Sequence, residues 1–403
     1  NVKRKSVLAG AVIIVVILVA FAASYTWAQP GQWVDINQTT ANLNSIFMLS
    51  TNEGWAVGNN GTILYWDGLG WRLVQSPTTQ NLTSVFFPDA SNPNDGWIVG
   101  QANSTSGTFF PAILHWDGIA WVQLDTTSGI SWAGGDVGDL RSLYFLSPSD
   151  GWAVGAPGSV TNIVHWSGRW AAGGSWTTKI TPDNTATLYS VQVLSNTATP
   201  VGGYAVGGKT GPLGVIFFWD GANWNTYIGS VPAATLRSVS MISSTDAWAV
   251  GDFVAPAGPA VIRLSGTTWG GPMSVSALGI QQLFSVVAID ANNAFAVGRI
   301  AAGGGTDIIK FTTPSWTVVS SPATVDLYSV CKVASGSSDM WSVGAWGTIL
   351  RNTGGIWRVL TSPVGAGDMF APPPVPPPDL QSVHFTAPSN GWAVGANGTI
   401  IKY

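Results

Sequence analysis

The chain has 403 residues, of which only 9% are charged, and its formal net charge is -4 at pH 7. So few basic residues leave no positive patch for a nucleic-acid backbone, so nucleic acid is not an expected partner. A single cysteine, Cys331, excludes an intrachain disulfide, and packing alone must hold the fold together.

The first thirty residues contain a long apolar run. Residues 7–25 carry no charge, and the basic residues Lys3, Arg4 and Lys5 precede them. A helix rises about 1.5 Å per residue, so this run can cross a bilayer core of about 30 Å. The basic cluster would keep the N-terminus inside and place the rest outside. We predict one hydrophobic helix within a segment 1–30, with these side chains available for assembly: Val7, Leu8, Val12, Ile13, Ile14, Val15, Val16, Ile17, Leu18, Val19 and Phe21.

Three interpretations of this segment are open. It could be a secretory signal cleaved after residues 26–28, a single retained membrane anchor, or a pilin-type helix that packs with copies of itself. The chain starts at Asn1 and not at Met. We expect on this ground that the segment is retained and that neighbouring copies hold it.

From residue 43 onward the chain repeats two short motifs eight times. A Leu-x-Ser segment opens each copy, at Leu43, Leu82, Leu140, Leu188, Leu236, Leu283, Leu327 and Leu380. An aromatic-x-Val-Gly segment follows, at Trp55, Trp97, Trp152, Tyr204, Trp248, Phe295, Trp341 and Trp392. A period of roughly 40 to 55 residues with several short strands per unit is typical of a β-propeller.

The first copy shows how each unit is built. Apolar alternation predicts strands over 43–47, 54–58, 63–66 and 71–74, with a hairpin turn at Asp67-Gly68. Four antiparallel strands make one blade, which gains stability by stacking on its neighbours. A Trp opens the fourth strand of most copies, and in the third copy either Trp170 or Trp176 fills that position.

The two ends of the chain complement each other. The eighth copy stops at Tyr403, after its third strand, and residues 31–36 read as a fourth strand without its first three. Joining them closes the ring and removes exposed sheet edges. We therefore predict an all-β propeller of eight four-stranded blades over residues 31–403, preceded by the apolar helix. Seven blades is the competing count, if the fifth or sixth copy is something else. The residues expected to close the ring are Trp33, Val34, Ile36, Ile400, Ile401 and Tyr403.

The repeat resembles a known family. Gly-Trp-Ala-Val-Gly at 54–58, 151–155 and 391–395, followed by Gly-Thr-Ile at 61–63, 347–349 and 398–400, is similar to BNR-like propellers and to photosystem II assembly factors. This resemblance implies the propeller fold and says little about function. The first thirty residues resemble type IV pilins in layout, with one apolar helix ahead of an extracellular domain.

We find no pattern that predicts catalysis. Many Asp residues stand in Asp-Gly turns, Arg141 and Arg237 share the variable position of Leu-x-Ser, and His115 and His165 share a position on neighbouring third strands. Two histidines without a third ligand do not predict a metal site. We expect no enzyme activity, no cofactor and no metal.

Five Asn-x-Ser/Thr sequons fall in blades eight, one and two, which are contiguous in a closed ring. They are Asn37, Asn60, Asn81, Asn103 and Asn397. The sequons predict one glycosylated, solvent-facing sector.

These features favour a structural subunit of an extracellular, pilus-like filament. Its helices would form the filament core after leaving the membrane, and its propeller would be displayed for adhesion or surface attachment. The expected partners are other copies of the chain, the membrane before assembly, and glycans or cell surfaces. The alternative is a membrane-anchored or secreted propeller that recognises glycan or protein. An assembly factor and an enzyme are the remaining candidates, the enzyme last.

Overall fold

The computed structural model describes residues 33–36, 38–105, 108–124, 137–159, 161–179, 181–195, 202–211, 213–229, 231–254, 258–271, 273–300, 307–333, 339–364 and 377–403. The predicted apolar helix, with its assembly side chains Val7 to Phe21, lies outside these residues, as does Asn37. Within them, no helix combines the length and the apolar character that crossing a membrane requires.

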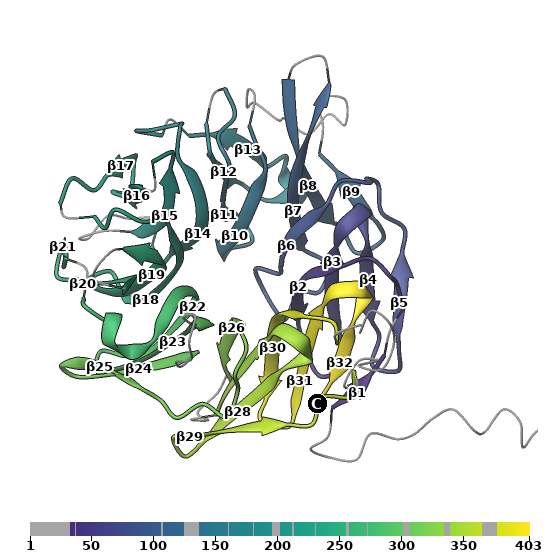
Figure 1. Cartoon of the computed structure of the whole chain (residues 1–403). Coiled ribbons are helices and arrows are strands. Elements are labelled where there is room, and N and C mark those ends of the chain that lie inside the picture. The colour runs from purple at the N-terminus through teal and green to yellow at the C-terminus, as the bar shows by residue number, and fades with distance from the viewer. Residues whose placement is uncertain are drawn as a thin grey trace, which may run out of the picture.

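The described residues form eight four-stranded antiparallel sheets arranged as blades around one axis (Figure 1). This confirms the eight-bladed propeller and excludes the seven-bladed alternative. The first four blades contain β2 (Leu43–Met48), β3 (Gly54–Gly58), β4 (Ile63–Trp66), β5 (Trp71–Val74); β6 (Leu82–Phe86), β7 (Gly96–Thr105), β8 (Thr108–Trp116), β9 (Trp121–Gln123); β10 (Leu140–Ser147), β11 (Asp150–Gly155), β12 (Ile163–Ser167), β13 (Ser175–Thr178); and β14 (Thr187–Val193), β15 (Gly203–Lys209), β16 (Leu213–Trp219), β17 (Trp224–Thr226).

The other four blades repeat this order. They contain β18 (Leu236–Ser243), β19 (Asp246–Val254), β20 (Gly258–Ser265), β21 (Thr268–Trp269); β22 (Ile280–Asp290), β23 (Asn293–Ile300), β24 (Ile308–Thr312), β25 (Ser315–Val318); β26 (Leu327–Lys332), β27 (Met340–Gly344), β28 (Ile349–Thr353), β29 (Ile356–Leu360); and β30 (Leu380–Ala387), β31 (Asn390–Gly395), β32 (Ile400–Lys402), β1 (Val34–Asp35). Within the described residues, five short 3-10 helices lie in connections: η1 (Asn59–Gly61), η2 (Trp170–Ala172), η3 (Ser276–Leu278), η4 (Ala345–Gly347) and η5 (Ala396–Gly398).

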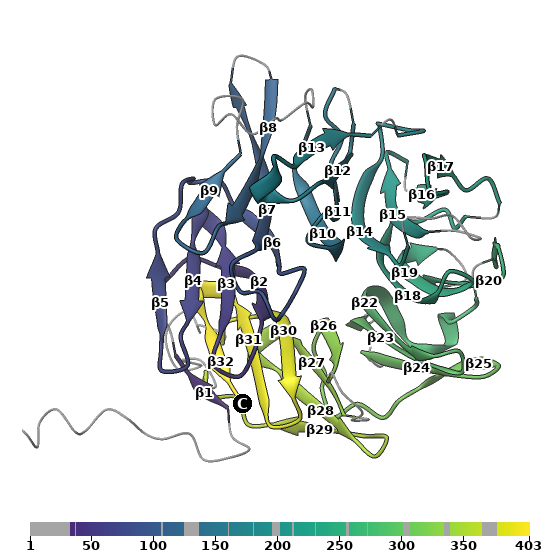
Figure 2. The ribbon, with the colours of Figure 1, turned by 180° about the vertical axis from the view of Figure 1, so that it is seen from behind.

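The eighth blade draws strands from both ends of the described chain, in the order β1-β32-β31-β30. Val34 pairs with Lys402 and Asp35 with Ile401, and the Ile36 amide donates to the Ile400 carbonyl at 2.8 Å. The first strand of every blade lies nearest the ring axis, as the two opposite views show (Figure 2). β1 is therefore on the perimeter of the ring.

The antiparallel order gives the ring two distinct faces. Connections between first and second strands and between third and fourth strands share one face, which in blade one carries residues 49–53 and 67–70. We call it the groove face. Connections between second and third strands and between neighbouring blades share the other, which in blade one carries residues 59–62 and 75–81. We call it the sequon face.

One aromatic pair recurs at every interface between neighbouring blades. The second-strand aromatic of each blade meets the fourth-strand Trp of the next, with ring centroids 5.0 to 6.0 Å apart and planes at 69° to 89°. The eight pairs are Trp55–Trp121, Trp97–Trp176, Trp152–Trp224, Tyr204–Trp269, Trp248–Trp316, Phe295–Trp357, Trp341–Trp33 and Trp392–Trp71. Edge-to-face packing of this kind contributes beyond the apolar area it buries. The pairing also shows that Trp176, and not Trp170, is the fourth-strand Trp of blade three.

The Ser of the Leu-x-Ser motif joins neighbouring first strands. Its hydroxyl oxygen accepts a bond of 3.3 to 3.4 Å from a Val amide of the next blade. The pairs are Ser45–Val85, Ser142–Val191, Ser190–Val239, Ser238–Val286 and Ser285–Val330. The Ser of the motif therefore links neighbouring first strands at these five seams.

Candidate functional site

Arg141, Tyr189 and Arg237 occupy the variable position of Leu-x-Ser in blades three, four and five, so the tyrosine comes between the two arginines. The Arg141 and Arg237 guanidinium carbons are each 5.3 Å from the centroid of the Tyr189 ring, so both make cation–π contacts with it. Arg237 also forms an ion pair with Asp252 on β19. These contacts give Arg237 a structural role, whereas Arg141 is exposed beside the Tyr189 ring.

The same layer of side chains continues through blades six to eight. Arg299 lies 5.5 Å from the Phe284 ring and bonds Asp326 at 2.8 Å, and Phe284 packs on Tyr328 at 5.6 Å. Burial, aided by the nearby carboxylates of Asp379 and Asp326, raises the pKa of Tyr328 to about 12. The phenol therefore stays neutral at physiological pH and is a poor general base.

The two histidines belong to a repeated acid–base arrangement. His115 Nε2 lies 2.7 Å from Asp95, and His165 Nε2 lies 2.7 Å from Asp150. Other blades use different side chains at the same two positions: Tyr65 with Glu53, Arg263 with Asp246, and Arg351 with Asp339. Each of these third-strand residues also packs on the motif Trp of its own blade, as in the 3.9 Å stack of His165 on Trp152.

Sequence reasoning missed these pairs. The available signal was an acidic residue directly before the second strand's Gly-Trp or its equivalent, in register with a basic residue, His or Tyr on the third strand. The arrangement leaves each histidine with one carboxylate. Over the described ranges, no group of three or more His, Cys, Asp or Glu side chains is placed to hold a metal ion.

Three hollows of similar size open between neighbouring blades on the groove face. They lie between blades one and two, two and three, and five and six, with volumes of about 390, 420 and 460 Å³. All three use a third-strand residue of the acid–base arrangement in their lining: Tyr65, His115 and Arg263. These three seams between blades therefore each form a concave site, and the side chains that line it differ from seam to seam.

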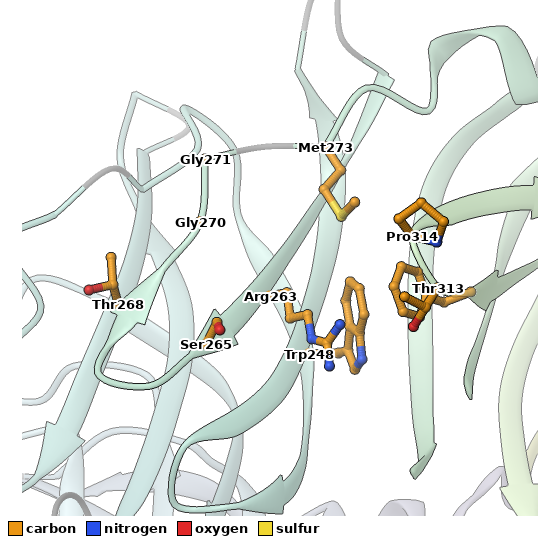
Figure 3. A pocket seen from close by; sticks show the side chains of 10 residues that line it. Trp248, Arg263, Ser265, Thr268, Gly270, Gly271, Met273, Thr313 and Pro314 are labelled. Carbon is orange, nitrogen blue, oxygen red and sulfur yellow. The ribbon is translucent and has the colours of Figure 1, made fainter. Parts of the chain in front are cut away.

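The hollow between blades five and six is mainly apolar in its lining (Figure 3). Trp248 and Arg263 lie side by side, with Pro314 across from them and Met273 above. Arg263 is held by two 3.0 Å bonds to Asp246, and it lies 5.1 Å from the Trp248 ring. Its charge is thus compensated inside the blade.

The hollow between blades two and three has a mixed lining of polar and apolar groups. Its lining includes Asp89, Asn92, Asn94, Asp117, Arg169 and Trp170, together with His115. The side chains come from loops of both blades on the groove face.

Comparison with known proteins supports the fold and goes no further. No family model matches the chain, and no curated protein matches it. Among solved structures, the chain is similar to the computationally designed Ika8 protein (14% identity, TM-score 0.62, covering 93% of this chain and 99% of the other) and to the WD40 β-propeller domain of Doa1 (12%, 0.52, 94% and 98%). It is also similar to YCF48 bound to D1 peptide (17%, 0.50, 93% and 98%). The likeness at these identities is one of fold.

The four described sequons lie on the sequon face. Asn60 and Asn397 adopt left-handed backbone conformations, with φ of 56° and 54°, in the equivalent turns η1 and η5. Asn is favoured there over most other residues, so the turn alone explains both of them. Asn81 bonds the Asn60 amide and the Gln101 side chain, and Asn103 is exposed on β7.

The predicted ring-closing residues lie in blade eight and at its interfaces with blades seven and one. Trp33 is 6% exposed and packs on Trp341, and the Tyr403 ring lies 5.5 Å from it. Ile400 and Ile401 are fully buried, and Ile36 packs at the interface with blade one.

Proposed function

We propose that the chain is a structural subunit of an extracellular filament, in which residues 7–25 assemble and the propeller is displayed. The role is non-covalent, since helices leaving the membrane would bury their apolar side chains against one another. The observation that carries the proposal is the uncharged 19-residue run, residues 7–25. It comes shortly before β1, which lies on the perimeter of the ring as the fourth strand of blade eight. A segment attached at the perimeter leaves both faces of the ring open.

The direction of β1 supports the same arrangement. As a fourth strand, β1 begins at the groove-face end with Trp33 and runs toward the sequon face. The preceding segment therefore joins the ring at the end opposite Asn60, Asn81 and Asn397. Glycans on those residues would point away from the point of attachment, where they do not obstruct assembly.

Electron microscopy of native material, with N-terminal sequencing of the subunit, tests the proposal. We expect filaments of micrometre length whose subunits retain residues 1–28. A variant chain beginning at Gln29 is the control, and it should give single rings. Native material that consists of single rings beginning near Gln29 would refute the filament.

A second function is favoured by the three hollows on the groove face: non-covalent recognition of glycan or protein by a displayed propeller. Concave sites that combine aromatic walls with a few fixed polar groups are the usual ligand sites of proteins. Binding of the full chain to glycan and cell-surface protein arrays tests it. A chain that binds neither would exclude recognition, and it would leave filament assembly untouched.

A further inference from the structure

We propose that the groove between blades two and three binds a neutral saccharide residue. We call it the blade 2–3 groove, lined by Asp89, Asn92, Asn94, Asp117, Arg169 and Trp170, with His115. The inference rests on the recognition function proposed above, and it names the site and the ligand class.

Two loops that are longer than the corresponding loops of the preceding blade meet at this groove. The connection between first and second strands spans residues 49–53 in blade one and is longer in blade two, at 87–95. The connection between third and fourth strands spans residues 117–120 in blade two and is longer in blade three, at 168–174, where it contains η2. Both enlarged loops line the same hollow. Insertions in a repeat scaffold commonly build its binding sites.

Trp170 stands outside the strand positions of the repeat, although its ring also meets the motif residue Trp97 edge-to-face, with centroids 6.1 Å apart. Every other described Trp except Trp346 stands at a second-, third- or fourth-strand position of the repeat, and Trp176 already fills the fourth-strand position of blade three. Trp170 instead stacks on His115, with ring centroids 4.0 Å apart and planes at 25°, and stays partly exposed. Indole is amphipathic and rigid, so it can carry the apolar C–H face of a sugar ring at low entropic cost.

The polar lining suits hydroxyl groups, which both donate and accept hydrogen bonds. Asn92 and Asn94 offer both functions, Asp89, Asp95 and Asp117 accept, and Arg169 donates. The carboxylates disfavour an anionic ligand, and the nearby guanidinium disfavours a purely cationic one. A neutral, polyhydroxylated ring is therefore the class that this set fits.

Three carboxylates line the groove; Asp95 bonds His115, and Asp89 and Asp117 are fixed by their own loops before any ligand arrives. Asp89 Oδ1 accepts bonds from the amide and hydroxyl of Ser91, and Asp117 Oδ1 accepts bonds from the Ile119 and Ala120 amides. These bonds lower the pKa of both groups, so both remain ionised acceptors. A site that is organised in advance avoids much of the ordering cost of binding.

One residue that lines the groove, His115, is buried and has a ring nitrogen without a partner in the part of the chain that the structure describes. His115 is 1% exposed, its Nε2 lies 2.7 Å from Asp95, and its Nδ1 has no hydrogen-bond partner among the described residues. A buried polar atom without a partner is costly and calls for an explanation. A ligand hydroxyl entering beside Trp170 would supply that partner.

The experiment uses the full chain in detergent, with the methyl glycosides of glucose, galactose and mannose as probes and calorimetry as the readout. We expect at least one glycoside to bind, Trp170→Ala to weaken its affinity by about tenfold or more, and Trp170→Phe to retain most of it. Asp117→Asn keeps the size of the side chain and should weaken the same glycoside. Trp346→Ala is the matched control on the opposite face, and it should leave the affinity unchanged.

The possible results separate the two proposals. No binding of any glycoside overturns the saccharide site, and a chain that still binds a protein on the array keeps its recognition function. Glycoside binding that Trp170→Ala leaves unchanged also overturns the assignment to this groove. Tighter binding of N-acetylneuraminic acid or of choline, lost in Trp170→Ala, would show that the groove takes a charged ligand and would refute the neutral class.

Discussion

Replacing Trp33 with Ala should destabilise the whole ring, although Trp33 lies far in sequence from the blade seven residues it contacts. Trp33 is 6% exposed, and its ring lies 5.7 Å from Trp341, 5.9 Å from Phe385 and 5.5 Å from Tyr403. It supplies the fourth-strand partner of the blade seven aromatic, and without it one of the eight edge-to-face pairs is missing.

The expected loss follows from that burial. Truncating a well-packed Trp to Ala costs about 3–5 kcal/mol of unfolding free energy. Unfolding entropy is about 2.1 cal/mol/K per residue, so in a ring of this size each kcal/mol lowers Tm by about 1.3 °C. Trp33→Ala should therefore lower Tm by about 4–6 °C, measured by circular dichroism on the full chain in detergent.

A double-mutant cycle isolates the closure itself. Trp33→Ala and Tyr403→Ala remove two rings in contact, and we expect a coupling of about 0.5–1.5 kcal/mol between them. Trp224→Ala is the matched control, because Trp224 is equally buried at another interface and should add independently to Tyr403→Ala. A cost of less than about 1 kcal/mol for Trp33→Ala, or additivity with Tyr403→Ala, would refute the closed ring.

Four further substitutions follow from the structure, each read out as unfolding free energy. Burial lowers the pKa of His384 to about 4, so the unfolded chain binds a proton that the folded chain does not as pH falls from about 6.5. Between pH 7 and pH 4 the unfolding free energy of the wild type should fall by about 3 kcal/mol more than that of His384→Gln. Parallel plots of unfolding free energy against pH for the two proteins would contradict this. Burial raises the pKa of Asp307 to about 6. The unfolding free energy that the protonated carboxyl provides is fully present below pH 3.8 and is lost as pH rises through 6. Asp307→Asn should therefore raise the unfolding free energy by about 3 kcal/mol at pH 7 and leave it unchanged at about pH 3.5. Trp346 has φ 55° in the turn where its equivalents are Asn, so Trp346→Asn should stabilise by about 1 kcal/mol, and a loss would show that the indole contributes to packing. Ser238→Ala should cost about 1 kcal/mol by leaving the Val286 amide unpaired, whereas no change would mean that water replaces the hydroxyl.

The repeat made the fold predictable from the sequence. Eight Leu-x-Ser segments and eight aromatic-x-Val-Gly segments correspond to eight first strands and eight second strands. A strand can be predicted from neighbouring residues alone, and the alternation of side chains along a strand determines which of them share a face of the sheet. The apolar N-terminal helix remains a prediction, since it lies outside the described residues.

Contacts between blades were harder to predict. Sequence could not decide between Trp170 and Trp176, because both are tryptophans near the start of a fourth strand. Both rings contact Trp97 across the seam, so the choice depends on strand register: Trp176 lies on β13 opposite Trp166, whereas Trp170 lies in η2 of the enlarged hairpin. The pairing of His115 with Asp95 was missed for a related reason, since the two residues are 20 apart and meet only through strand register.

The regularity of the ring makes its exceptions informative. At every seam an aromatic and a Trp satisfy the same packing requirement, so a Trp at a repeat position needs no functional explanation. In the described part of the chain, Trp170 and Trp346 alone lie outside those positions, on opposite faces of the ring. Trp346 is 60% exposed in a turn that favours Asn, whereas Trp170 lines a hollow beside a buried histidine whose Nδ1 lacks a partner. Exposure alone does not make a site, so the enclosed Trp170 is the stronger candidate for ligand contact.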